Sequence, residues 1–173
     1  MTTNREAVAA LAADAAVIGG PETTLSSDEL RRFIAEQLAA TDFDGKSVCL
    51  VLPDGTRSSP LPLLLRCVHD ALAGRATRIT AVIALGTHVA MSEEALARHH
   101  EWDKPETFVS LGTISAERVS ELSGGLLAVA AEVALNRVVV DHDVALVIGP
   151  VFPHEVVGFS GGNKYFFPGI AGQ

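Results

Sequence analysis

The residues best suited to chemistry lie near the end of the sequence, between positions 153 and 169. This segment contains His154, Ser160, Lys164 and four glycines, and it follows a strongly apolar stretch. Glycine permits positive φ angles and a close approach of the backbone to a ligand, while serine and lysine supply hydrogen-bond donors. Such a loop is typical of sites that hold an anionic or covalently attached group, although a tight turn that ends in an exposed lysine has the same composition.

A second polar cluster, Asp54-Gly55-Thr56-Arg57, follows another apolar stretch. Aspartate and glycine are common turn formers, so a plain surface turn is one explanation. In the functional interpretation, the planar guanidinium of Arg57 binds a carboxylate or phosphate through two hydrogen bonds. Asp54 would then orient the arginine or the ligand.

The third cluster is Gly86-Thr87-His88, again directly after an apolar stretch. A neutral imidazole at a strand end is suited to acid/base chemistry near pH 7. The remaining histidines outside these clusters lack a supporting motif and are interpreted as surface or core residues. They are His69, His99, His100 and His142.

The hydrophobic pattern predicts alternating helices and strands. Helices are expected at residues 5–17, 26–41, 58–74 and 91–99, and strands at residues 46–52, 79–85, 108–111, 138–140 and 144–148. Residues 119–134 fit either a hairpin or a helix.

Three of the predicted strands, at residues 46–52, 79–85 and 144–148, are almost continuously apolar, which indicates burial on both faces. Two of them are followed by a polar loop and a helix. We therefore expect an α/β fold with a mostly parallel sheet and flanking helices, as one layered domain over residues 1–173. Because loops at the carboxyl ends of such strands meet at one edge, the three polar clusters should converge there.

Composition excludes several classes of protein. The net charge of −8 repels phosphate backbones, so nucleic acid is not an expected partner. No apolar run approaches the roughly 20 residues that cross a bilayer, and no signal-peptide pattern opens the chain. These features predict a cytoplasmic protein that does not bind a membrane.

Four familiar site types are also absent from the sequence. Cys49 and Cys67 have neither a metal-binding nor a disulfide spacing, which predicts two buried thiols. Lys164 stands between Asn163 and Tyr165, whereas a P-loop lysine follows glycine and precedes serine or threonine. The Gly-x-Gly-x-x-Gly dinucleotide fingerprint does not occur at the first strand-helix turn.

Taken together, the clusters resemble the N-terminal domain of the lactate racemase family, whose members use a nickel-pincer nucleotide. The similarity spans about residues 45–172 and rests on the order and spacing of separate motifs. These are Asp54-Gly55-Thr56-Arg57, Gly86-Thr87-His88 with Ser92-Glu93-Glu94, Asn136, Pro153-His154, Gly158-Phe159-Ser160-Gly161-Gly162-Asn163-Lys164 and Pro168-Gly169.

The resemblance implies a role for individual residues. His88 and His154 would shuttle protons, and Lys164 would carry the cofactor through a thioamide in the holo form. Arg57 would bind the substrate. The other residues implied in cofactor binding are Asp54, Thr56, Ser160, Gly161 and Gly162. The implied reaction is racemisation or epimerisation of a small-molecule 2-hydroxy acid, by hydride transfer to the pincer ring and a planar 2-keto acid.

Members of the family continue into a C-terminal domain that includes a nickel-binding histidine, whereas this sequence ends at Gln173. We therefore expect an N-terminal fragment without that metal ligand, inactive and without cofactor when alone. Its exposed apolar surface would favour homo-oligomers. The alternative is a non-catalytic domain that binds a phosphate or nucleotide ligand, or an assembly module. Two histidines at two strand ends favour the enzyme, because a phosphate sensor needs donors rather than a pair of neutral bases.

Overall fold

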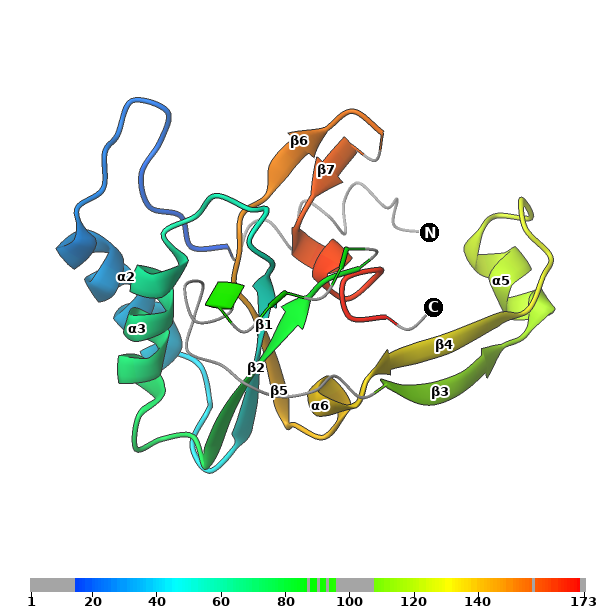
Figure 1. The fold of residues 1–173 in the computed structure, drawn as a ribbon, viewed down its shortest axis with the longest axis horizontal. Helices are drawn as coiled ribbons and strands as arrows, with labels where there is room; N and C mark the ends of the chain where they lie inside the picture. Colours follow the sequence, from blue (N-terminus) through cyan, green and yellow to red (C-terminus); the bar gives the residue numbers. More distant parts are fainter. Residues whose placement is uncertain are drawn as a thin grey trace.

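The computed structural model describes residues 15–86, 88, 89, 91, 92, 94, 95, 108–156 and 158–171 (Figure 1). Most of the helix predicted at residues 5–17 lies outside these ranges, and residues 15–17 are not helical. Of the helix predicted at 91–99, the described part contains a helical pair, Glu94 and Ala95. The Ser92 hydroxyl accepts a hydrogen bond from the Ala95 N–H at 3.2 Å, as expected of an N-cap.

The centre of the fold is a parallel sheet of three strands in the order β2-β1-β5. The strands are β1 (Ser47–Pro53), β2 (Arg78–Ala84) and β5 (Val144–Val147). Strand β1 pairs in parallel with both neighbours and is buried along almost its whole length. The prediction of an α/β fold with a parallel sheet is therefore confirmed. The expected burial on both faces holds for β1 but not for β2 and β5, whose residues are mostly half-buried.

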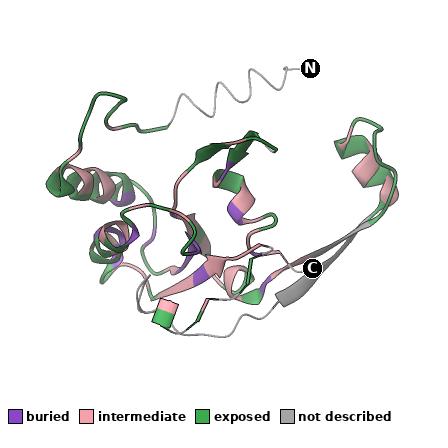
Figure 2. Cartoon of the chain, turned by 45° about the horizontal axis from the view of Figure 1, so that its top comes forward, coloured by how far each residue is buried: buried purple, intermediate pink, exposed green. Residues whose placement is uncertain are grey.

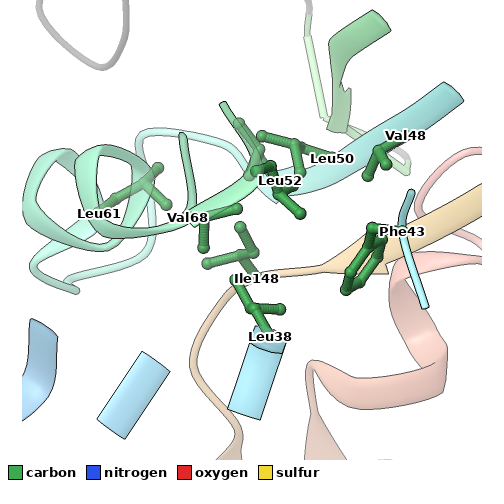
Figure 3. Packing of buried hydrophobic residues seen from close by; sticks show 9 residues of the cluster. Leu38, Phe43, Val48, Leu50, Leu52, Leu61, Val68 and Ile148 are labelled. Atoms are coloured by element: carbon green, nitrogen blue, oxygen red, sulfur yellow. The ribbon is translucent and has the colours of Figure 1, made fainter. Parts of the chain in front are cut away.

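Two helices cover one face of this sheet (Figure 1). Helix α2 (Ser27–Ala39) begins at a capping box in which Ser26 and Glu29 satisfy each other's backbone N–H groups. Helix α3 (Leu61–Leu72) begins after Pro60, close to the predicted start. The core between sheet and helices contains the buried side chains Leu38, Phe43, Val48, Leu50, Leu52, Leu61, Val68, Leu72 and Ile148 (Figure 3).

The opposite face of the sheet packs against later parts of the chain. Alternate side chains of β1, Cys49 and Val51, join a second core cluster with Val82, Tyr165 and Ile170. Burial raises the pKa of the Cys49 thiol to about 12. Cys49 and Cys67 are both buried and unbridged, as the sequence predicted.

An arm of antiparallel strands extends away from this body (Figure 1). It consists of β3 (Phe108–Ile114), α5 (Ala116–Leu122) and β4 (Ala131–Asn136), with β3 paired to β4. The strand predicted at 108–111 is therefore longer than expected. The ambiguous residues 119–134 contain the end of a helix and the start of a strand.

The strand predicted at residues 138–140 is wrong, because Arg137–Val140 forms a short helix, α6. The run of valines favours a strand, but Asn136 caps the helix: its side-chain oxygen accepts a hydrogen bond from the Val138 N–H at 2.9 Å. Val138 and Val139 then pack on the second core cluster. Tertiary packing and a cap thus override the local strand preference.

After β5 the chain forms a small hairpin and a 3-10 helix. The hairpin pairs β6 (Phe152–His154) with β7 (Gly158–Ser160), and η1 (Gly162–Tyr165) follows. Figure 2 shows that the hairpin and α5 are largely exposed, whereas buried residues concentrate around the central sheet. Among the described residues, no helix is both long and apolar enough to cross a bilayer.

The central core provides a direct test of the fold. Leu52 is fully buried, so Leu52→Ala should lower the free energy of unfolding by about 2–5 kcal/mol, through lost apolar contacts and a residual cavity. Leu126→Ala is the matched control, because Leu126 is 86% exposed and should change stability by less than about 0.5 kcal/mol. Denaturant unfolding of both variants measures the difference. Equal losses would contradict the observed core.

Candidate functional site

The three polar clusters meet in a pocket of about 230 Å³ at the carboxyl edge of the sheet. The loop after β1 contributes Asp54 and Arg57, and the segment after β2 contributes His88. The hairpin and the turn after it contribute His154, Ser160, Gly161 and Lys164. The expected convergence is therefore observed. Of the residues to which the resemblance assigns a role, Thr56 and Gly162 do not line this pocket, and Thr87 of the third cluster lies outside the described residues.

Asp54 links the first two clusters. Its Oδ2 lies 2.5 Å from His88 Nδ1, and its Oδ1 accepts hydrogen bonds from the Thr56 hydroxyl at 2.6 Å and the Thr56 N–H at 3.2 Å. Burial alone would raise the pKa of Asp54, but the hydrogen bonds from Thr56 and His88 outweigh it and hold the pKa below its ordinary value. The carboxyl group is therefore ionised at neutral pH.

This charge determines which nitrogen of His88 carries hydrogen. An ionised carboxylate only accepts hydrogen bonds, so His88 Nδ1 must donate. In the neutral ring, Nε2 is then left with a lone pair. The side chain of His88 is 46% exposed, while that of Asp54 is 7% exposed. A buried anion thus orients an accessible imidazole that presents a basic nitrogen.

His154 has a different partner. Its Nδ1 accepts a hydrogen bond from the Val156 N–H at 3.2 Å, within the hairpin. Neutral His154 therefore carries its hydrogen on Nε2. The two histidines that line the pocket are held in opposite tautomers.

Two cations complete the polar lining. Arg57 and Lys164 are both half-buried, and within the described ranges neither forms an ion pair. The backbone of Lys164 is fixed by hydrogen bonds from its N–H to Gly161 O and from the Gly169 N–H to its own carbonyl, each 3.1 Å long. The pocket therefore combines acid/base groups with two positive charges suited to an anion.

Tyr165 also lines the pocket, and sequence reasoning missed it. Its ring is buried and its hydroxyl donates a long hydrogen bond to Pro150 O at 3.5 Å. Burial raises the pKa of this tyrosine, against a smaller opposing effect of the Arg57 charge. The position directly after Lys164 was the available signal, because a buried neighbour is needed to fix the lysine backbone.

The loop after β2 is held by a backbone hydrogen bond to the segment that follows η1. The Gly86 N–H donates a hydrogen bond to Gly169 O at 2.8 Å, and Pro168 and Gly169 line the pocket beside Gly86. No group of three or more His, Cys, Asp or Glu side chains with metal-binding geometry occurs in the part of the chain that the structure describes.

Together these features define a class: an α/β protein whose site lies at the carboxyl edge of a parallel sheet. Residues 24–173 match the model of the lactate racemase N-terminal domain, and the chain belongs to this family. It is 28% identical over 132 residues to the lactate racemase of Thermoanaerobacterium thermosaccharolyticum, and 27% identical over 129 residues to that of Lactiplantibacillus plantarum. These matches cover 73% and 72% of the chain, which spans 30% of the length of each relative.

Solved structures show the same fold. A crystal structure of a Thermotoga maritima protein matches with a TM-score of 0.70 and 27% identity, over 90% of this chain and 40% of that one. The lactate racemase apoprotein of Thermoanaerobacterium thermosaccharolyticum matches with a TM-score of 0.58 and 21% identity, over 86% of this chain and 38% of that one. At that identity the second likeness concerns the fold alone.

The turn that presents Lys164 depends on one glycine. Gly161 has a φ of +80°, and an added Cβ would overlap with the Pro150 carbonyl oxygen. Gly158 also has a φ of +80°, but nothing lies within 4 Å of an added Cβ. Gly158→Ala should therefore cost only about 1–2 kcal/mol of stability for its backbone conformation. Gly161→Ala should cost roughly 1–3 kcal/mol more, because backbone atoms must move.

Denaturant unfolding of the two glycine variants measures this difference. A Gly161→Ala variant as stable as Gly158→Ala would contradict the close approach of the turn to Pro150.

Proposed function

We propose that this chain supplies the proton-transfer, substrate-binding and cofactor-attachment groups of a 2-hydroxy acid racemase or epimerase that acts in the cytoplasm. The observation that carries the proposal is the meeting of two histidines, Arg57 and Lys164 in one pocket. Membership of the lactate racemase N-terminal domain family supports it. Two curated relatives named lactate racemase support it further.

The two histidines would transfer the protons in this reaction. A racemase must act on either face of one carbon centre, so it needs a positioned acid/base group for each enantiomer. Neutral His88 presents a lone pair on Nε2, whereas neutral His154 carries hydrogen on Nε2. The opposite tautomers suit opposite roles. The His88 ring accepts the hydroxyl proton of the substrate, and the His154 ring donates a proton to the product.

Arg57 would bind the carboxylate of the substrate. A 2-hydroxy acid carries a carboxylate, and a guanidinium binds a carboxylate through two parallel hydrogen bonds. Arg57 lines the same pocket as His88 and forms no ion pair with another described residue. Asp54 is less suited to ligand binding, since both of its carboxylate oxygens already accept hydrogen bonds.

The residues present fit attachment of a nickel-pincer nucleotide at Lys164. An amine must be unpaired and reachable to form an amide-type bond, and Lys164 lines the pocket without an ion pair in the described ranges. Ser160 and Gly161 lie beside it in the lining, with Gly162 next in sequence. When bound, this cofactor supplies a centre that accepts and returns a hydride. The chain's own groups would position the substrate and move the hydroxyl proton.

Cofactor attachment can be tested on this chain. After co-expression with enzymes that make the nickel-pincer nucleotide, the intact mass should increase by one cofactor, and fragmentation should place the addition at Lys164. Lys164→Arg keeps the charge but cannot form the bond, so its mass should stay unchanged. A chain without any adduct, or an adduct in the Lys164→Arg variant, would contradict attachment at this residue. Phosphate binding without an adduct would instead favour a non-catalytic phosphate-binding domain.

The histidine roles can be tested in a chimera in which residues 24–173 replace the matching part of the Thermoanaerobacterium thermosaccharolyticum lactate racemase. His88→Ala and His154→Ala should slow the two directions of racemisation unequally in single-turnover assays. Each should lose on the order of 10²-fold in its own direction, the usual scale for a positioned acid/base group. Small and equal losses would show that the histidines only shape the pocket.

A further inference from the structure

We propose that Thr56 is a positioning residue, which acts through Asp54 to hold His88 in the tautomer that carries hydrogen on Nδ1. This inference deepens the proposed function and rests on it for the catalytic meaning of His88. The resemblance implied that Thr56 contacts the cofactor, but its side chain does not line the pocket. Its contacts are with the carboxylate behind His88 instead.

The geometry identifies the donor in each of the two side-chain hydrogen bonds, from Thr56 to Asp54 and from His88 to Asp54. The Thr56 hydroxyl lies 2.6 Å from Asp54 Oδ1, and the other carboxylate oxygen lies 2.5 Å from His88 Nδ1. Because an ionised carboxylate cannot donate, both the hydroxyl and Nδ1 must carry the hydrogen. The hydroxyl hydrogen of Thr56 is therefore used on Asp54 rather than on a ligand.

The hydroxyl is the stronger of two restraints on the same oxygen. Without it, Asp54 Oδ1 would retain only the Thr56 N–H at 3.2 Å. A short hydrogen bond to a charged acceptor is stronger and more directional than a longer one from a neutral amide. Losing it would free the buried carboxylate to rotate, so Oδ2 would no longer stay aligned with the His88 ring.

The turn itself does not depend on the hydroxyl. The Arg57 N–H donates to the Asp54 carbonyl at 3.3 Å, and this backbone bond is independent of the side chain at position 56. Thr56→Val keeps the branched shape and removes only the hydroxyl. Thr56→Ser keeps the hydroxyl and removes only the methyl group. The pair therefore separates positioning through the hydrogen bond from a purely structural role in the turn.

The experiment measures the His88 tautomer in this chain by long-range ¹⁵N–¹H correlation NMR, at a pH where the ring is neutral and without cofactor or substrate. His88→Gln identifies the signal. In the unsubstituted chain the hydrogen should lie on Nδ1. Thr56→Val should shift the tautomer ratio roughly tenfold toward Nε2–H, the scale of one lost hydrogen bond, and Thr56→Ser should restore it. Other ionisable groups lining the pocket are unchanged in both variants: Asp54, Arg57, His154, Lys164 and Tyr165.

Three results would overturn the inference. His88 with its hydrogen on Nε2 in the unsubstituted chain would do so without any variant, even if Thr56→Val failed to fold. An unchanged tautomer ratio in a folded Thr56→Val variant would remove the role of the hydroxyl. A shift in Thr56→Ser as large as in Thr56→Val would assign the effect to the methyl group. Because the measurement needs no cofactor, absence of a Lys164 adduct would count against the proposed function and leave this result standing.

Discussion

The burial of β1 on both faces is the constraint on which the rest of the structure depends. Val48, Leu50 and Leu52 pack toward the helices, while Cys49 and Val51 pack toward the end of the chain. A strand with no polar face must lie between two layers, and its backbone groups must then pair with neighbouring strands. The parallel pairing with β2 and β5 satisfies those groups and brings the following loops to one edge.

The second core cluster couples the fold to the site. Tyr165 and Ile170 bury their side chains against β1 and β2, on either side of the turn that closes over Gly86. Lys164 precedes one of these anchors directly, so its backbone is held by the core while its side chain lines the pocket. The position of Lys164 therefore depends on apolar burial rather than on an ion pair with another described residue, which leaves its amine available.

The sequence predicted the central strands and the pocket because both follow from strong local patterns. Continuous apolar runs bounded by turn residues favour buried strands, and the loops after parallel strands meet at one edge of the sheet. It failed at α6, where an Asn136 cap and packing decide the outcome, and at the arm, whose ambiguous residues divide between α5 and β4. The contact of Asp54 with His88 and the packing partners of Tyr165 could not be predicted, since each joins segments that are distant in sequence.

The two histidines of the pocket are oriented by different kinds of hydrogen-bond partner, and their tautomers differ for that reason. His88 is oriented by a side chain, the buried Asp54 carboxylate, which only accepts hydrogen bonds. His154 is oriented by a backbone group, the Val156 N–H, which only donates. Opposite tautomers thus follow from the polarity of the partner and not from the imidazoles themselves. For His154 to present a lone pair on Nε2, it must move its hydrogen to Nδ1 and give up the bond to Val156. One pocket therefore contains two identical side chains that begin with opposite abilities at Nε2, one to accept a proton and the other to donate one.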